Sequence, residues 1–131
     1  MKNLLIIEDD PITITLYKYI LKKAGFNLYI LEDGNEIMQL LSISEIDLII
    51  MDISLKNTYL DNQKIDGIKF SKYIKCNPRY NKIPIIIVTA YSGKIKEENF
   101  IKENMADKII TKPIVDFNLF INIIREQIKI E

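Results

Sequence analysis

A chain of 131 residues with 48% hydrophobic and 27% charged residues has the composition of one globular domain and is not disordered. Its 18 basic and 18 acidic residues cancel, so the net charge does not indicate nucleic acid or an anionic membrane as a partner. Without histidine and with one cysteine, Cys76, the chain cannot build a histidine-based triad or a thiolate or imidazole metal site, so any metal must be bound by oxygen.

Apolar runs and helix signals alternate through the first half of the chain. Residues 3–7 are an apolar run typical of a buried strand, and Asp10 with Pro11 then marks the start of a helix that ends near Ala24. The predicted packing stripe of this helix consists of Ile12, Leu16, Tyr19, Ile20 and Lys23. The next predicted elements are a strand at residues 26–31, a short helix that starts at 33–36 and ends near 42–44, and a central strand at 48–51 that is buried on both faces.

The second half continues this alternation after one irregular segment. Residues 55–66 are polar and lack a sustained period, so we interpret them as a surface loop that is long for a strand-to-helix connection. A helix over about residues 68–76 is expected to pack through Ile68, Tyr73 and Ile74, with Cys76 used for packing and not for redox chemistry. The remaining predicted elements are a strand at 85–88, a helix at about 95–103, a strand at 108–111 and a helix at 116–129 that packs through Phe117, Phe120, Ile121, Ile124 and Ile128.

Five strands that alternate with five helices predict the fold class. Because crossovers between parallel strands are right-handed, the helices should cover both faces of the sheet and give a three-layer, doubly wound α/β domain over residues 1–131. No signal peptide precedes the first strand, and no apolar run approaches the ~18 residues of a membrane span. We therefore expect a single cytoplasmic domain without membrane insertion.

Chemically competent side chains stand where four of the predicted strands end. Glu8 and Asp9 come after the first strand, and Asp52 comes after the central strand. Thr89 and Lys112 end the last two strands in the same way. Because parallel sheets of this type carry their sites at the carboxyl ends of the strands, we expect these five side chains to meet at one edge.

Three ionised carboxylates at one edge require a cation. Two like charges ~5 Å apart repel by about 3 kcal/mol at an effective dielectric of about 20, and a third increases this cost. Mg²⁺ suits a site made of oxygen atoms and accepts a phosphate oxygen as a further ligand. We expect Asp9 and Asp52 to bind Mg²⁺ directly and Glu8 to bind it directly or through water. The backbone carbonyl of Ser54 would complete the protein ligands.

An ionised carboxylate beside a divalent cation can attack phosphorus, because the metal screens the charge that would otherwise repel a phosphoryl group. The Lys112 ammonium would pair with one phosphoryl oxygen, and the Thr89 hydroxyl would donate a hydrogen bond to a second. The third oxygen is left for Mg²⁺. The pattern therefore predicts a site for phosphoryl transfer.

These residues and their order resemble a known family. The matching segments are Ile7-Glu8-Asp9-Asp10, Met51-Asp52-Ile53-Ser54, Asp66-Gly67, Val88-Thr89-Ala90 and Lys112-Pro113. Together they are similar to the receiver domain of two-component response regulators, over essentially the whole chain. The resemblance implies the flavodoxin-like fold of the chemotaxis regulator, a parallel five-stranded sheet of order 2-1-3-4-5.

By this resemblance Asp52 is the phospho-acceptor, which takes a phosphoryl group from a histidine kinase or a phosphotransfer protein. Glu8 and Asp9 are the acidic pair, Thr89 is the switch hydroxyl, and Lys112 contacts the phosphate. Such a domain is not a conventional enzyme, because it catalyses its own phosphorylation and a slow autodephosphorylation. No DNA-binding domain follows Glu131, so we expect the output to be contact with a downstream protein or a homodimer through the face of the fourth helix, fifth strand and fifth helix.

Three departures from the family pattern concern the site. Lys56 stands where members commonly have proline, and the segment 55–66 is longer than usual and could contact a kinase or gate access. Ile109 replaces the usual aromatic switch residue, so the familiar coupling between a ring and the threonine is not expected, with Tyr91 as a speculative substitute. Ser54 and Tyr91 occupy positions that often tune dephosphorylation.

Other classes of protein share parts of this pattern. A flavodoxin-like cofactor binder would have the same fold, but the acidic residues after the first strand would repel its phosphate. A phosphatase of the haloacid-dehalogenase type needs a second acid where this chain has Ser54. A receiver-like scaffold that is not phosphorylated and acts by association is favoured by Ile109 and the long segment, and disfavoured by the intact site residues.

Overall fold

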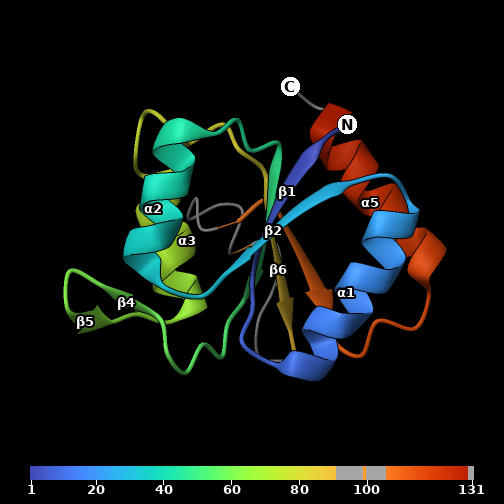
Figure 1. Ribbon diagram of the computed structural model, residues 1–131, viewed down its shortest axis with the longest axis horizontal. Coiled ribbons are helices and arrows are strands. Elements are labelled where there is room, and N and C mark those ends of the chain that lie inside the picture. Colours follow the sequence, from blue (N-terminus) through green and yellow to red (C-terminus); the bar gives the residue numbers. More distant parts are fainter. Residues whose placement is uncertain (91–98, 100–105, 130–131) are drawn as a thin grey trace.

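In the part of the chain that the structure describes, five parallel strands form one sheet with helices on both faces (Figure 1). The computed structural model describes residues 1–90, 99 and 106–129. The strands in spatial order are β2 (Asn27–Leu31), β1 (Asn3–Ile7), β3 (Leu48–Asp52), β6 (Ile85–Thr89) and β7 (Lys108–Thr111). Counted without the hairpin strands β4 and β5, this is the order 2-1-3-4-5, so the predicted fold is confirmed. The helix predicted over 95–103 lies outside the described residues, apart from residue 99.

Four helices of the described ranges flank the sheet, namely α1 (Pro11–Lys23), α2 (Gly34–Ile43), α3 (Gly67–Lys75) and α5 (Phe117–Lys129). The first three each begin after an aspartate, Asp10, Asp33 or Asp66, whose carboxylate accepts a hydrogen bond from a backbone N–H in the first turn. Gly25 has a φ of 95°, and α1 ends just before it, as predicted. None of the described helices is long and apolar enough to cross a lipid bilayer.

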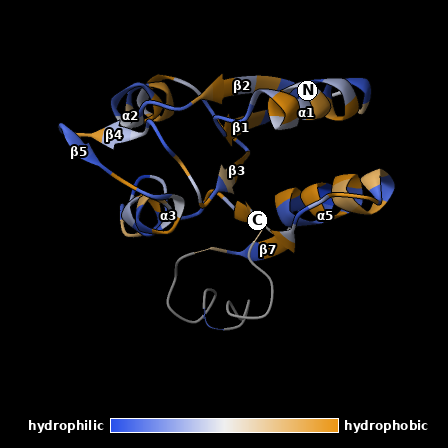
Figure 2. Cartoon of the chain, turned by 90° about the horizontal axis from the view of Figure 1, so that it is seen from below, coloured by the Kyte–Doolittle hydropathy of each residue, from blue (hydrophilic) through white to orange (hydrophobic). Residues whose placement is uncertain are grey.

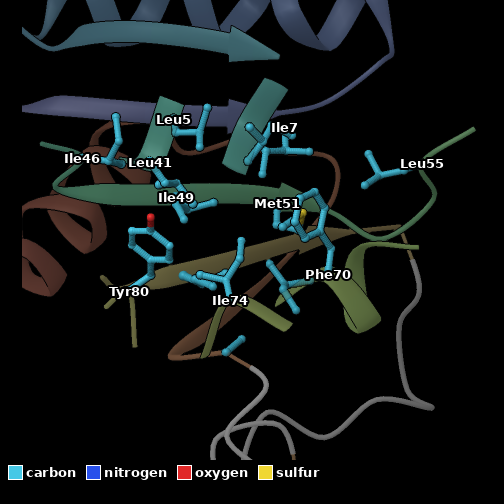
Figure 3. Packing of buried hydrophobic residues seen from close by; sticks show 14 of the residues in the cluster. Leu5, Ile7, Leu41, Ile46, Ile49, Met51, Leu55, Phe70, Ile74 and Tyr80 are labelled. Carbon is cyan, nitrogen blue, oxygen red and sulfur yellow. The ribbon is translucent and has the colours of Figure 1, made fainter. Parts of the chain in front are cut away.

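Side chains that alternate along the strands build two separate hydrophobic layers. The layer beneath α2 and α3 contains Leu5, Ile7, Ile49, Met51, Ile85 and Ile87 of the sheet, with Phe70 and Ile74 of α3 (Figure 3). Figure 2 shows α1 and α5 on one side of the sheet and α2 and α3 on the other. The layer beneath α1 and α5 contains Leu4, Ile6, Leu48, Ile50, Ile86 and Val88, with Tyr17 and Phe120. Both β3 and β6 are buried at every position, as expected for central strands covered on two faces.

The predicted packing stripe of α1 is partly wrong. Its buried residues are Tyr17, Ile20 and Leu21, whereas Ile12 is 81% and Tyr19 is 66% exposed. Apolar residues lie on more than one side of this helix, so the periodicity alone fits two neighbouring stripes. The sheet selects the stripe that places the Tyr17 ring against Phe120, with ring centroids 5.9 Å apart.

Three further packing predictions fail, in and beside α3 and at the start of α5. Ile74 of α3 is fully buried, but Tyr73 is 45% exposed and Phe70 takes the inner position instead. Cys76 is exposed and not packed, because it is the C-cap residue beyond the last turn of α3. At the start of α5, Phe117 is 39% exposed, although the rest of its predicted stripe faces the sheet or its border.

The segment 55–66 is not the irregular loop that its composition predicted. It contains an antiparallel hairpin of β4 (Tyr59–Leu60) and β5 (Gln63–Lys64). Asp61 and Asn62 form its two-residue turn with φ values of 51° and 67°, a conformation that Asn and Asp adopt more readily than most residues. This turn chemistry was the signal that the absence of a sustained period concealed.

We predict that the layer beneath α1 and α5 depends strongly on Phe120, which is 2% exposed. Phe120→Ala should lower the free energy of unfolding by about 3–5 kcal/mol, because it removes a buried ring and leaves a cavity. The control Phe117→Ala, in the same helix, should cost less than about 1 kcal/mol. Urea denaturation of both variants checks this, and equal losses would contradict the assigned faces of α5.

Candidate functional site

The register of the sheet brings the strand ends level with one another. Ile7 at the end of β1 pairs with Met51, and Asp52 at the end of β3 pairs with Val88. Thr89 then pairs with Thr111, the residue before Lys112. Polar residues that follow these strands therefore gather at the carboxyl edge of the sheet.

Glu8, Asp52 and Lys112 meet at this edge. Lys112 Nζ lies 3.0 Å from Glu8 Oε1 and 3.4 Å from Asp52 Oδ1. Alternation along the strands explains the meeting, because these residues share the parity of Ile6, Ile50 and Ile110, which face α1 and α5. Glu8 is 3% and Asp52 is 8% exposed, so the ammonium contacts carboxylates that water hardly reaches.

Asp9 completes a group of three carboxylates. One carboxylate oxygen from each of Glu8, Asp9 and Asp52 lies within 4.8 Å of the other two, a spacing at which one ion can contact all three. Asp10 serves a different purpose, because its carboxylate caps α1 by accepting hydrogen bonds from Thr13. The structure thus separates the cluster from the neighbouring acid, as the sequence suggested.

Thr89 and Ser54 lie beside the cluster. Thr89 is 1% exposed, and its carbonyl accepts a hydrogen bond of 2.8 Å from the backbone N–H of Lys112, which ties the ends of β6 and β7 together. Ser54 is exposed two residues after Asp52. Its backbone carbonyl remains a predicted metal ligand.

Burial changes the acid–base behaviour of this group. Desolvation raises the pKa of Glu8 above its ordinary value, the negative charge of Asp52 adds to the effect, and the hydrogen bond from Lys112 opposes it. Burial alone would lower the pKa of Lys112, but its hydrogen bond to Glu8 and the charge of Asp52 leave that pKa raised. Lys112 is therefore fully charged at neutral pH.

Two participants were missed by the sequence reasoning. Tyr17 of α1 lines the same small cavity as Lys112, and burial first and then the charges of Glu8 and Asp52 raise the pKa of its hydroxyl. The backbone N–H of Lys56 donates a hydrogen bond of 2.8 Å to Asp9 Oδ2. The helical period did not distinguish Tyr17 from its neighbours in α1, and a long-range backbone contact leaves no mark in the sequence.

The start of α3 at Asp66 and Gly67 packs closely against the end of β3. A Cβ atom at Gly67 would lie 2.0 Å from the carbonyl oxygen of Asp52, and the Gly67 N–H donates to the carbonyl of Ile53 at 3.0 Å. A side chain cannot fit there without moving the backbone of β3 at the site. Asp66 begins α3 directly before this contact, so the helix start is fixed against the end of β3.

Comparison with known proteins identifies the family. The family model of the response regulator receiver domain matches residues 4–125. The chain belongs to this family. The resemblance read from the motifs is thereby confirmed. Receiver domains interact with histidine kinases or phosphotransfer proteins and with downstream targets, and they are generally not conventional enzymes.

Relatives and solved structures agree with the assignment to receiver domains. The chain is 29% identical over 113 residues to the polar-differentiation response regulator DivK of Brucella anthropi, which covers 86% of this chain and 85% of the relative. The signal receiver domain of a histidine kinase from Syntrophus aciditrophicus is 26% identical, with a TM-score of 0.80 over 98% of this chain and 91% of its own. The receiver domain of the sensor histidine kinase PA1611 from Pseudomonas aeruginosa, 23% identical with a TM-score of 0.78 over 98% of both chains, has a magnesium ion coordinated in its active-site cleft.

One departure of this receiver domain lies on the face opposite Lys112. Ile109 in β7 is half-buried and packs against the layer beneath α2 and α3, beside its register partner Ile87. An aliphatic side chain therefore fills the place predicted for an aromatic switch residue. Tyr91, the substitute considered from the sequence, lies outside the described residues.

We predict that Glu8→Gln stabilises the metal-free receiver domain at pH 7. Folding raises the pKa of Glu8, so the wild type gains stability when Glu8 is protonated and loses it as pH rises through the folded pKa. Glutamine has no charge to desolvate, and its amide oxygen can still accept the Lys112 hydrogen bond. Urea denaturation in EDTA should show an advantage of the variant near pH 7 that shrinks toward pH 4. A less stable variant at pH 7 would mean that the Lys112 ion pair outweighs burial.

Proposed function

We propose that this receiver domain accepts a phosphoryl group on Asp52, with Mg²⁺, from the phosphohistidine of a kinase or a phosphotransfer protein. The observation that carries the proposal is the contact of the Lys112 ammonium with Asp52 Oδ1 at 3.4 Å, inside a group of three carboxylates. A nucleophilic carboxylate, a cation to steady it and acids to hold a metal are the parts that phosphoryl transfer requires.

The donor set fits Mg²⁺, because it consists of carboxylate oxygens on adjacent strand ends. Asp9 and Asp52 would hold the ion directly, Glu8 directly or through water, and the backbone carbonyl of Ser54 would add a ligand. When bound, the ion would neutralise much of the carboxylate charge and screen the negative phosphoryl group from Asp52. The magnesium ion in the receiver domain of PA1611 supports this choice of metal.

In the transfer itself, an Asp52 carboxylate oxygen attacks the phosphorus atom. The new O–P bond forms as the P–N bond of the phosphohistidine breaks, and the electron pair of that bond returns to the imidazole, which takes up a proton. Lys112 is placed to stabilise the negative charge of the phosphoryl group. Its ammonium already contacts the attacking carboxylate of Asp52 and can turn from Glu8 to a phosphoryl oxygen. The raised pKa of Lys112 keeps this cation charged throughout.

The phosphorylated state would be transmitted through Thr89 and the surface near β7 and α5. Thr89 ends β6, and its hydroxyl would donate to a second phosphoryl oxygen and move the following loop. A groove of about 160 Å³ between β7 and α5 includes Leu119, which is 55% exposed. This exposed apolar surface supports a protein contact there, with a downstream target or a second copy. The fourth helix of the expected face lies outside the described residues.

A scaffold that acts by association alone is the second candidate. The observation that favours it is the half-buried Ile109 at the position of the usual aromatic switch, which removes one route from phosphate to surface. Such a protein would keep the fold and the binding face without accepting phosphate.

We predict that Asp52→Asn abolishes phosphorylation. Incubation with acetyl phosphate should add one phosphoryl group to the wild type only when Mg²⁺ is present, because the amide of asparagine is not a nucleophile. The control Asp10→Asn should behave as the wild type, since asparagine caps a helix as well as aspartate does. Intact-protein mass is the measurement. Phosphorylation of Asp52→Asn at an unchanged rate would overturn the site, and no phosphorylation of the folded wild type would favour the scaffold.

We predict that Lys112→Ala weakens the structural change that follows phosphorylation. The variant should keep its fold but show a much smaller phosphate-dependent change, because no ammonium remains to hold the phosphoryl oxygen. Amide NMR spectra with and without acetyl phosphate and Mg²⁺ report the change, and Lys108→Ala in the same strand is the control. A full phosphate-dependent shift of the Thr89 region in Lys112→Ala would rule out this role.

A further inference from the structure

One oxygen of the Asp9 carboxylate is held by a part of the chain that is remote in sequence. Asp9 Oδ2 accepts its 2.8 Å hydrogen bond from Lys56, 47 residues later, and the donor is the backbone N–H. The contact therefore depends on the path of the chain after β3 and not on the Lys56 side chain. This path gives the metal site a support that the strand ends alone do not supply.

The chain is anchored on both sides of Lys56. On one side, Leu55 is 5% exposed, belongs to the layer beneath α2 and α3 (Figure 3), and donates its N–H to the carbonyl of Ile53 at 3.0 Å. On the other side, Thr58 is fully buried and its carbonyl accepts from the N–H of Ile65 at 3.0 Å, which closes the base of the hairpin. Lys56 thus lies between a core contact and the β4–β5 hairpin.

The hairpin is itself docked against the first turn of α2 (Figures 1 and 2). A Cβ atom at Gly34 would lie 2.5 Å from the carbonyl oxygen of Tyr59 and 3.1 Å from Leu60 Cβ, so only glycine allows this approach. The N–H of Asp61 also donates to Asn35 Oδ1 at 3.3 Å. Tyr59 is three residues from Lys56, a span of at most about 10 Å, so the hairpin and the Lys56 N–H belong to one short stretch of chain.

We infer that the β4–β5 hairpin is a positioning element for the metal site. Its docking at Gly34 fixes the Lys56 N–H, which orients Asp9 through Oδ2 and leaves the other carboxylate oxygen for Mg²⁺. A ligand that is already oriented loses less freedom when it binds, and hydrogen bonds to metal ligands commonly change metal affinity about 10- to 100-fold. The inference rests on the proposed Mg²⁺ site and gives the long connection of this chain a role in it.

The first test compares Lys56→Pro with Lys56→Ala by isothermal titration with MgCl₂. Both variants lose the ammonium, but only proline removes the backbone N–H. The dissociation constant of Mg²⁺ for Lys56→Pro should be about tenfold higher than for Lys56→Ala, which should stay near the wild type. Asp9→Ala, titrated in parallel, gives the affinity of a site without this ligand.

The second test moves the hairpin and leaves Lys56 unchanged. Gly34→Ala suits the helical backbone of α2 but drives its Cβ into the Tyr59 carbonyl, so it should weaken Mg²⁺ binding several-fold, in the same direction as Lys56→Pro. Ser42→Ala, at the other end of α2, should leave the affinity unchanged. Thermal unfolding of each variant in EDTA records any loss of metal-free stability.

The outcomes are distinct. No Mg²⁺ binding by the wild type would remove both the proposed metal site and this inference. Wild-type binding that Asp9→Ala abolishes, with Lys56→Pro and Gly34→Ala as tight as their controls, would keep the proposed function and overturn the positioning role. The positioning role would also be overturned if these two variants lose metal-free stability but bind Mg²⁺ as tightly as their controls, because the contacts would then serve stability only. Weaker binding by both variants against their controls supports the inference.

Discussion

The ion pair of the Lys112 ammonium with two nearly inaccessible carboxylates, Glu8 and Asp52, is the interaction on which the site depends. Each partner comes from the end of a different strand, so the contact exists only when β1, β3 and β7 are in their observed register. Without the ammonium, two like charges would face each other in a region of low dielectric. The register of the parallel sheet therefore creates this charge arrangement.

This ion pair does not neutralise the group of three carboxylates. Glu8, Asp9 and Asp52 carry three negative charges when ionised, and Lys112 offsets one of them. The raised pKa of Glu8 reflects its surroundings, because burial and the neighbouring Asp52 carboxylate both disfavour the ionised form of Glu8. A divalent cation would remove this imbalance, and a phosphoryl group would then arrive at a site whose charge no longer repels it. The proposed metal binding and the proposed phosphoryl transfer would therefore have one electrostatic cause.

The sequence predicted correctly the features that depend on neighbouring residues, and it missed those that depend on how distant segments pack together. Buried strands are visible in the sequence as apolar runs, so the positions of Glu8, Asp52, Thr89 and Lys112 at their ends could be predicted. The order of the sheet was predicted from the resemblance to receiver domains. The buried face of α1 could not, because Ile12 and Tyr19 satisfy a helical period as well as Tyr17 does, and only the sheet decides between them. The hairpin was missed because two-residue strands are too short to show a period.

The residues of the proposed site are positioned in two different ways. The acids, the threonine and the lysine stand at strand ends, where the doubly wound fold alone brings them together. The support of Asp9 has a different origin, since it needs the 55–66 segment to fold, to dock on a glycine of α2 and to present one backbone N–H. A segment that composition describes as a polar loop thus has a defined position, and it holds one oxygen of the Asp9 carboxylate. The segment after β3 thus contacts the proposed site through its backbone and not through its side chains.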